Sequence, residues 1–147
     1  MQPIDPEFES RIRESFAKQG AMSTLGATLE RVEAGRIEIR MPFSANFVQH
    51  NGYIHAGFLT TIVDSAAGYA AYTVAPPGTN VLTVEYKANF LAPGKGDWFL
   101  ARGEVVKAGR TLVIAKGDVY AHRAGAEPVH VVTLTSTIMI LPGKAGN

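Results

Sequence analysis

Apolar residues near the start of the chain recur every fourth position. These residues are Phe8, Ile12 and Phe16. Such a spacing places them on one stripe of a helix. Pro6 suits the first turn of a helix and Gly20 suits its end. The pattern therefore predicts a helix over residues 6–18.

Two different apolar patterns follow along the chain. Residues 28–41 alternate apolar and charged side chains around Ala34-Gly35, which predicts a β-hairpin. Residues 56–72 form the longest apolar segment, rich in Ala and Gly, and five of its apolar residues follow helical spacing. Those residues are Leu59, Ile62, Val63, Ala66 and Tyr69. We therefore expect a hairpin followed by a long, largely buried helix.

Four strand candidates make up the rest of the chain. They cover residues 81–91, 98–107, 111–122 and 130–140. Turn signals between them are Pro93-Gly94, Ala108-Gly109 and Gly125. Because these connections are short, we expect an antiparallel meander of the four strands. With the hairpin, the pattern predicts an α+β fold, in which an antiparallel sheet of about five or six strands wraps around one long central helix.

Composition indicates a single globular domain. The chain has 147 residues, of which 46% are hydrophobic and 18% charged. We expect one domain over residues 1–147, with a flexible tail at about 142–147. The N-terminal stretch lacks the apolar run of a signal peptide, and no window is long and apolar enough to span a membrane.

Charge and cysteine content narrow the class of function. The net charge is +1 without any block of basic residues, so neither nucleic acid nor membrane is an expected partner. The chain has no cysteine, which excludes a disulfide framework, a thiolate zinc site and a cysteine nucleophile. This composition fits a cytoplasmic protein.

Most familiar catalytic motifs are absent from the sequence. There is no G-x-S-x-G nucleophile elbow, no P-loop and no G-x-G-x-x-G after a strand. His50 and His55 lie five positions apart in an expected turn, without an H-E-x-x-H helix. We therefore predict no metal site.

Asp64 is the unusual residue of the long helix. It lies too far from the helix start to be an N-cap and has apolar neighbours on both sides. Burial of a lone carboxylate is costly unless it is paired, hydrogen-bonded or protonated. One interpretation places Asp64 on an exposed stripe with Thr60, Thr61 and Ser65. The other places it in a cleft as a general base or nucleophile.

The start of the same helix offers a second functional group. The first backbone N–H groups of a helix have no intrahelical acceptor and carry positive partial charge. Around Ala56 the sequence H-A-G leaves little side chain in the way, so this N–H could stabilise an oxyanion. An ordinary capped helix start is the alternative interpretation.

Helix geometry separates these two groups. Ala56 and Asp64 are eight residues apart, which corresponds to roughly 12 Å along a helix axis. An oxyanion donor and an attacking base must both lie within about 3 Å of one reacting group. One copy of the helix therefore cannot supply both, whereas antiparallel copies from two subunits could.

Several motifs together resemble one known family. The run H-A-G-x-x-x-x-x-x-D from His55 to Asp64 is similar to the H-G-G…D/E signature of PaaI-like hotdog-fold acyl-CoA thioesterases. The upstream Q-x-x-G (Gln49, Gly52), the strand LTVEYKANFLAPGKG and the hairpin KAGRTL match the same family. The resemblance covers nearly the whole chain and implies the hotdog fold.

The resemblance implies hydrolysis of an acyl-CoA, of aromatic or short to medium chain length, to a free acid and CoA. It implies no cofactor, since CoA is part of the substrate. The matching catalytic positions are Asp64 as carboxylate, the Ala56 N–H as oxyanion donor, Gln49 near the thioester, His55 at the helix start and Thr83 as a hydroxyl that positions water or acid. Family members are commonly homotetramers, as dimers of dimers, with Asp64 and Thr83 facing the partner's remaining site residues.

Other residues are expected to bind the substrate. Asn51 and Gly57 flank the helix start, and Phe58 could line an acyl pocket or simply belong to the core. Lys95, Lys107 and Arg110 lie in or beside turns and could meet the CoA phosphates, or could be solvated surface charges. Alanine replaces the first glycine of the family signature at position 56, which retains the N–H but adds a methyl group.

Two other functions compatible with this fold were considered. A non-catalytic hotdog protein could bind acyl-CoA or an aromatic ligand, and a dehydratase or hydratase would use a central histidine. Asp64 on the central helix favours a thioesterase over both.

Overall fold

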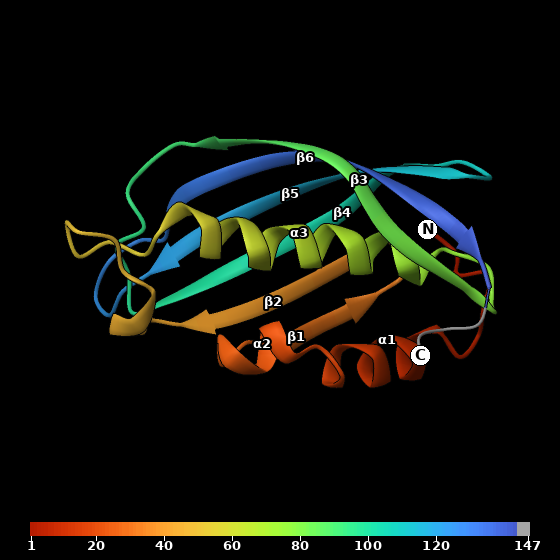
Figure 1. Cartoon of the computed structure of the whole chain (residues 1–147), viewed down its shortest axis with the longest axis horizontal. Helices are drawn as coiled ribbons and strands as arrows, with labels where there is room; N and C mark the ends of the chain where they lie inside the picture. Colours follow the sequence, from red (N-terminus) through yellow and green to blue (C-terminus); the bar gives the residue numbers. More distant parts are fainter. Residues whose placement is uncertain (144–147) are drawn as a thin grey trace.

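The structure, a computed structural model, describes residues 1–143 and has the expected order of elements (Figure 1). The helices are α1 (Phe8–Ala17), α2 (Gly20–Thr24), the 3-10 helix η1 (Ala45–Phe47) and α3 (Ala56–Thr73). The strands are β1 (Thr28–Glu33), β2 (Arg36–Pro42), β3 (Thr79–Phe90), β4 (Trp98–Ala108), β5 (Leu112–His122) and β6 (Val129–Pro142). The expected tail at 142–147 lies outside the described residues from position 144 onward, and Pro142 is the last residue of β6.

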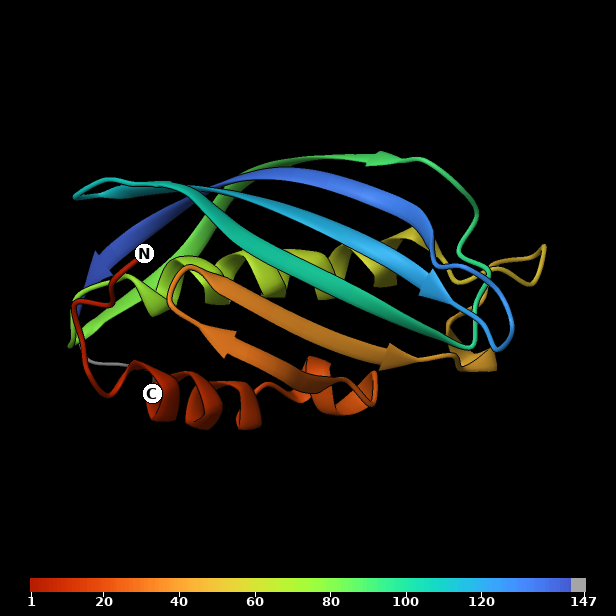
Figure 2. The ribbon, with the colours of Figure 1, turned by 180° about the vertical axis from the view of Figure 1, so that it is seen from behind.

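The strands form one six-stranded antiparallel sheet in the order β1-β2-β4-β5-β6-β3. The sheet curves around α3, which runs along its inner face (Figures 1 and 2). Helices α1 and α2 lie on the β1 side of the molecule. The predicted α+β architecture, a sheet wrapped around one long helix, is confirmed.

The position of β3 differs from the prediction. Only β4, β5 and β6 form a meander, whereas β3 pairs with β6 at the edge of the sheet. No edge of β4 is free for β3, because β2 and β5 pair with it on either side. Residues 91–97 therefore cross from the β3 edge to the middle of the sheet. On the way they pass the start of α3, where the Ile54 N–H donates to the Gly94 carbonyl at 2.9 Å.

Glycines in the sheet let α3 approach the strands closely. A Cβ at Gly103 of β4 would lie 2.2 Å from the backbone carbonyl carbon of Ala66. At Gly117 of β5, a Cβ would lie 2.5 Å from a methyl carbon of Val63. Both helix residues are fully buried. The small residues of the central helix thus match glycines in the strands beneath it, which explains why this apolar helix is rich in Ala and Gly.

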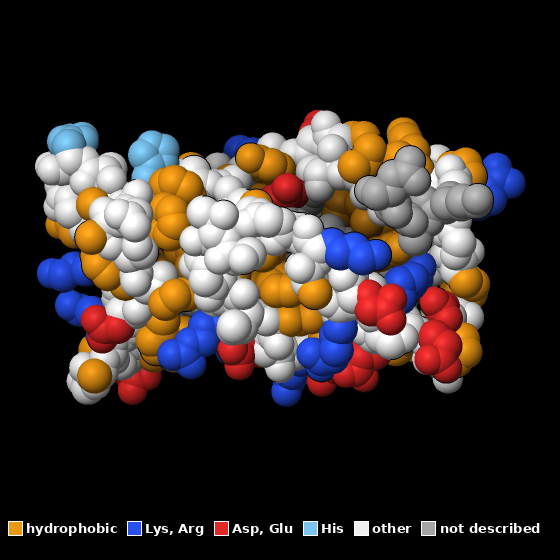
Figure 3. Space-filling model, turned by 60° about the horizontal axis from the view of Figure 1, so that its bottom comes forward, with side chains coloured by type: hydrophobic (Ala, Val, Ile, Leu, Met, Phe, Trp, Pro, Cys, Tyr) orange, Lys and Arg blue, Asp and Glu red, His pale blue; other side chains and the backbone are white. Residues whose placement is uncertain are grey.

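The N-terminal helices are fixed to the far end of α3. α1 ends at Ala17, and Gly20 begins α2 instead of ending the first helix as predicted. The Arg11 guanidinium donates hydrogen bonds to the carbonyls of Tyr72 and Ala75, each at 3.1 Å. A cation suits this position, because the last carbonyls of a helix carry negative partial charge. Acidic and basic side chains are intermixed over this side of the molecule (Figure 3).

Among residues 1–143, no helix has both the length and the hydropathy needed to cross a membrane.

Candidate active site

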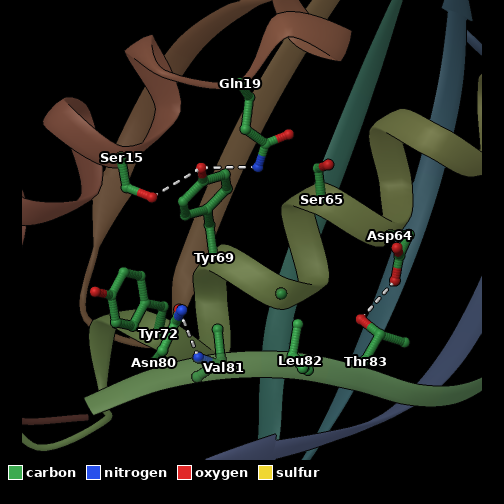
Figure 4. A pocket seen from close by; sticks show the side chains of 11 residues that line it. Ser15, Gln19, Asp64, Ser65, Tyr69, Tyr72, Asn80, Val81, Leu82 and Thr83 are labelled. Atoms are coloured by element: carbon green, nitrogen blue, oxygen red, sulfur yellow. Dashed lines mark hydrogen bonds between the residues drawn. The ribbon is translucent and has the colours of Figure 1, made fainter. Parts of the chain in front are cut away.

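A hollow of about 360 Å³ opens beside Asp64. Its floor is the outer face of α3, and its two walls are β3 on one side and the end of α1 on the other (Figure 4). Its lining is unusually polar for a ligand pocket. The polar side chains are Ser15, Gln19, Asp64, Ser65, Asn80 and Thr83, together with two tyrosines of α3.

Asp64 is hydrogen-bonded at the β3 side of this hollow. Thr83 Oγ1 donates to Asp64 Oδ1 at 2.9 Å, which leaves the other carboxylate oxygen available (Figure 4). Burial raises the pKa of Asp64 above its ordinary value, and the Thr83 hydrogen bond partly offsets that rise. A half-buried carboxylate of raised pKa in a hollow has the properties of a general base or nucleophile.

The exposed-stripe interpretation of Asp64 does not fit the helix. Thr60 is buried, and its hydroxyl donates back to the Ala56 carbonyl at 2.8 Å, whereas Thr61 is half-buried. Asp64 and Ser65 are both half-buried at the hollow. The polar positions of α3 therefore do not form one solvent-exposed row.

The start of α3 leaves one backbone donor without an acceptor. His55 is the N-cap, and its Nδ1 accepts a hydrogen bond from the Gly57 N–H at 2.9 Å. This bond requires an unprotonated Nδ1. Among the hydrogen bonds of the described residues, none uses the N–H of Ala56, the first residue of the helix. That donor is therefore available at the positive end of the helix dipole.

A second hollow of about 700 Å³ lies at this helix start. Gln49, Asn51, His55 and Ala56 line it, together with the apolar side chains of Phe90 and Leu91. The Gln49 Oε1 accepts from the Asn51 N–H, and the Gln49 N–H donates to the Tyr53 carbonyl at 2.8 Å. The side-chain oxygen of Gln49 is thus used within the loop, and its amide NH₂ remains as a donor toward the hollow.

The expected site residues fall into these two hollows. Asp64 and Thr83 line the first, whereas Gln49, Asn51, His55 and Ala56 line the second. Asp64 and Ala56 lie on the same helix, roughly 12 Å apart along its axis. Asp64 therefore cannot act on a carbonyl bound to the Ala56 N–H of the same chain.

The remaining expected residues lie elsewhere. Neither Gly57 nor Phe58 lines a hollow, and the Phe58 ring packs on Phe47 with a centroid distance of 4.7 Å. Lys95 is exposed and follows Gly94 at the second hollow. Arg110 is exposed in the β4–β5 turn, which lies at the opposite end of the molecule (Figure 1). One chain therefore does not bring the two cations together.

Sequence reasoning missed the α1 wall of the first hollow. Ser15 lies three positions after the buried Ile12, so it shares that residue's side of α1, whereas Gln19 lies in the link between α1 and α2. A polar residue on the apolar side of an amphipathic helix is the signal that could have identified Ser15; no such signal marks Gln19. No local pattern shows that this side faces Asp64, since that depends on tertiary packing.

Within the part of the chain that the structure describes, no group of three or more histidine, aspartate or glutamate side chains is arranged to hold a metal ion. The functional groups at the two hollows include a carboxylate, hydroxyl groups, amides, imidazoles and a helix N-terminus.

A comparison with family models gives one match. The model of the thioesterase superfamily matches residues 51–137. This range includes the start of α3, Asp64 and Thr83, but neither Ser15 nor Gln19. The match covers more than half of the chain.

Two curated relatives show the range of similarity. A protein of Halobacterium salinarum named "Putative esterase" is 32% identical over 139 residues, covering 89% of this chain and 91% of its own. The 1,4-dihydroxy-2-naphthoyl-CoA hydrolase of Listeria monocytogenes is 26% identical over 95 residues, covering 65% of this chain and 77% of its own.

Two solved structures share the fold. A thioesterase family protein from Silicibacter pomeroyi has a TM-score of 0.90 at 45% identity, covering 92% of this chain and 99% of that one. The E. coli PaaI protein, from the phenylacetic acid degradation operon, has a TM-score of 0.84 at 17% identity, covering 94% and 96%. The second likeness confirms the expected hotdog fold.

Proposed function

Since the chain belongs to the thioesterase superfamily, we propose that it hydrolyses an acyl-CoA to the free acid and CoA, at a site shared by two subunits. The observation that carries this proposal is Asp64, half-buried in a hollow and held by the hydroxyl of Thr83. One similar protein is named as a hydrolase of an acyl-CoA, the 1,4-dihydroxy-2-naphthoyl-CoA hydrolase, which supports this class of substrate.

The free edge of β3 supports the dimer. β3 is 12 residues long and ends the sheet, so one of its edges is unpaired within the described chain. Exposed apolar side chains project from it, with Leu82 58%, Val84 52% and Tyr86 47% accessible. Such an edge is a template for pairing with another strand unless it is protected. We propose that β3 of a second copy pairs with it antiparallel.

A two-fold axis near Tyr86 would complete the site. Within one chain Thr83 lies beside Asp64, whereas Phe90 lies at the second hollow beside Ala56. Antiparallel pairing about this axis would set Thr83 opposite the partner subunit's Phe90. Asp64 would then face the partner's Ala56, and each dimer would hold two complete sites. A dimer of dimers stays a prediction from the resemblance.

The proposed reaction uses each group for one task. The thioester carbonyl oxygen accepts a hydrogen bond from the Ala56 N–H, which stabilises the oxyanion as charge develops. Asp64 takes a proton from water while the water oxygen bonds to the carbonyl carbon. The carbon–sulfur bond then breaks, and the proton passes to the departing CoA thiolate. Thr83 orients the carboxylate through Oδ1.

Asp64 could also attack the carbonyl carbon itself. An anhydride would then form as CoA thiolate leaves, and water would cleave it to release the acid and restore Asp64. Both routes give the same products. Gln49, whose amide NH₂ is not used in its loop hydrogen bond, would contact the thioester in either route.

The CoA portion would extend from the second hollow. Asn51, Gly57 and Lys95 lie around this end of α3, and the charge of Lys95 suits a phosphate. Arg110 lies at the opposite end of the chain from Lys95. The Arg110 that could contact the same CoA would therefore belong to the subunit that supplies Asp64.

The test is release of free thiol from acyl-CoAs of short, medium and aromatic acyl groups. We expect turnover by the wild-type protein and a fall of about 10²–10⁴-fold in kcat/KM for Asp64→Asn and Asp64→Ala. Asp118→Asn is the matched control, because Asp118 lies outside both hollows and hydrogen-bonds His130 at 2.8 Å. Absence of turnover on every substrate, with binding retained, would instead favour a ligand-binding protein.

A further inference from the structure

The end of the Asp64 hollow nearest α1 carries a cluster of hydrogen-bonding side chains. Tyr69, only 5% exposed, places its hydroxyl between two residues of the N-terminal segment (Figure 4). Gln19 Nε2 donates to it at 2.8 Å, and Ser15 Oγ lies 3.2 Å away. The catalytic scheme above uses none of these three side chains, although all of them line the same hollow as Asp64.

The cluster has hydrogen-bonding capacity left over. Tyr69 has one hydroxyl proton, which can be donated to Ser15, since Gln19 already donates to the phenol oxygen. The Ser15 hydroxyl proton and the Gln19 side-chain oxygen then have no acceptor or donor among the hydrogen bonds of the described residues. A ligand in the hollow would meet both a donor and an acceptor there. Burial raises the pKa of Tyr69, so its phenol stays neutral.

The charge of the lining restricts what can occupy the hollow. Among the described residues that line it there is no Lys, Arg or His, and Asp64 is the one carboxylate. A second negative charge would therefore be repelled by Asp64 without any compensating cation. An acyl group with a purely apolar end would leave the polar cluster desolvated and without hydrogen-bond partners, which is also unfavourable.

The path from Asp64 to this cluster is open along α3. Gly68 follows Asp64 by one helical turn, and a Cβ built there meets no atom within 4 Å. Asp64 and Tyr69 are separated by roughly 7.5 Å along the axis. That length matches an acyl chain of about six carbons or a single ring with one substituent.

We propose that Ser15, Gln19 and Tyr69 form the distal end of the acyl subsite, which selects an uncharged acyl group bearing a hydroxyl about six carbons from the thioester. The proposal rests on the hydrolysis proposed above, because the reacting carbonyl must lie at Asp64. Two of its three residues come from outside the range 51–137 that the family model matches. The N-terminal segment would thus determine which acyl group is accepted.

Three substrates of equal chain length test this selectivity, namely hexanoyl-CoA, 6-hydroxyhexanoyl-CoA and adipoyl-CoA. The distal group is methyl, hydroxyl or carboxylate, respectively. We expect wild-type kcat/KM to be at least about tenfold higher for the hydroxyl than for the methyl substrate, and lowest for the carboxylate. Ser15→Ala and Tyr69→Phe should each lower the hydroxyl-to-methyl ratio about tenfold.

Ser10→Ala is the matched control for Ser15→Ala. It lies on the same helix, its hydroxyl donates to the Glu7 carbonyl, and it does not line this hollow. Its hydroxyl-to-methyl ratio should equal that of the wild type. Melting curves of all variants separate a loss of selectivity from a loss of folding.

Gly68→Leu gives a second, independent readout. Its side chain would fill the hollow, so hydrolysis of the six-carbon substrates should fall at least about tenfold relative to acetyl-CoA. Equal wild-type rates on hexanoyl and 6-hydroxyhexanoyl groups, or an unchanged ratio in both Ser15→Ala and Tyr69→Phe, would overturn the subsite while leaving thioester hydrolysis intact. Failure of the wild type to hydrolyse any acyl-CoA would overturn both proposals.

Discussion

Thr83 on the edge strand donates a 2.9 Å hydrogen bond to Asp64 in the middle of the central helix. This bond joins β3, the strand at the edge of the sheet, to the carboxylate that lines the hollow. Burial raises the pKa of Asp64 and the bond lowers it, so the pKa of the free enzyme reflects the difference between the two effects.

Removal of the Thr83 hydroxyl should therefore shift the pH dependence of activity. In Thr83→Val the lowering contribution is lost, so the pKa of Asp64 rises further and the acid limb of the kcat/KM profile moves to higher pH. Thr61→Val, a change on the same helix outside both hollows, should leave the acid limb in place. If the acid limb of the kcat/KM profile stays fixed in Thr83→Val, or moves to lower pH, the pKa of Asp64 does not determine that limb.

Ala56→Pro tests the backbone donor at the start of α3. Proline lacks the N–H but is well tolerated at the first helical position, and His55 before it already has an extended conformation with φ −58° and ψ 134°. We expect kcat to fall about 10²–10³-fold with little change in melting temperature. Ala56→Gly retains the N–H and should keep most of the activity. Equal losses in the two variants would point to the side chain instead of the donor.

Mixing two inactive variants tests the shared site. In a heterodimer of Asp64→Asn and Ala56→Pro chains, one site contains both substitutions and the other contains neither. Random reassociation makes about half of the dimers mixed, so activity should recover to about a quarter of the wild-type value. The measurement is thiol release before and after co-refolding of the two proteins. If each chain carried a complete site, mixing would restore nothing.

Asp64→Asn should stabilise the folded protein at neutral pH. The folded-state pKa of Asp64 is raised, so the ionised carboxylate disfavours folding above that pKa. The wild type gains stability as the pH falls through the folded pKa toward the unfolded value, whereas the asparagine variant does not. We expect a melting temperature higher by a few degrees, on the order of 2–4 °C, at pH 7 and a smaller gap in acid. A variant that is less stable at pH 7 would contradict this balance.

Two glycine-to-alanine changes should have opposite effects on stability. At Gly103 the new Cβ would lie 2.2 Å from the Ala66 backbone, so the helix or the strand must move. We expect a loss of about 3 kcal/mol or more in the free energy of unfolding. At Gly68 no atom lies within 4 Å, and alanine should raise stability by about 0.5–1 kcal/mol through helix propensity. Urea unfolding of both variants measures the difference.

Local patterns predicted most elements of the fold but not the position of every strand. The alternation in residues 28–41 and the helical spacing in 56–72 depend on neighbours close in sequence. The place of β3 beside β6 depends on which strand edges remain free once β2 has paired with β4. A short connection suggests adjacent strands, but it does not require them.

The candidate site was partly visible in the sequence for the same reason. Asp64 stands out because it interrupts an apolar helix, and its distance from Ala56 already separates the two halves of the site. Ser15 and Gln19 belong to a different element, and their approach to Tyr69 depends on how α1 packs against α3. Single-sequence periodicity gives the side of a helix that faces inward, but not what that side meets.

The glycine contacts beneath α3 also bear on how the acyl preference could change over time. Because Gly103 and Gly117 leave the helix no room to shift, the base of the hollow is fixed in position. Its two walls, in contrast, come from a terminal helix and an edge strand, where half-buried positions such as Ser15 and Asn80 can change without disturbing the central packing. A lineage could therefore acquire a new acyl specificity at such positions while Asp64 and its partner Thr83 are inherited unaltered.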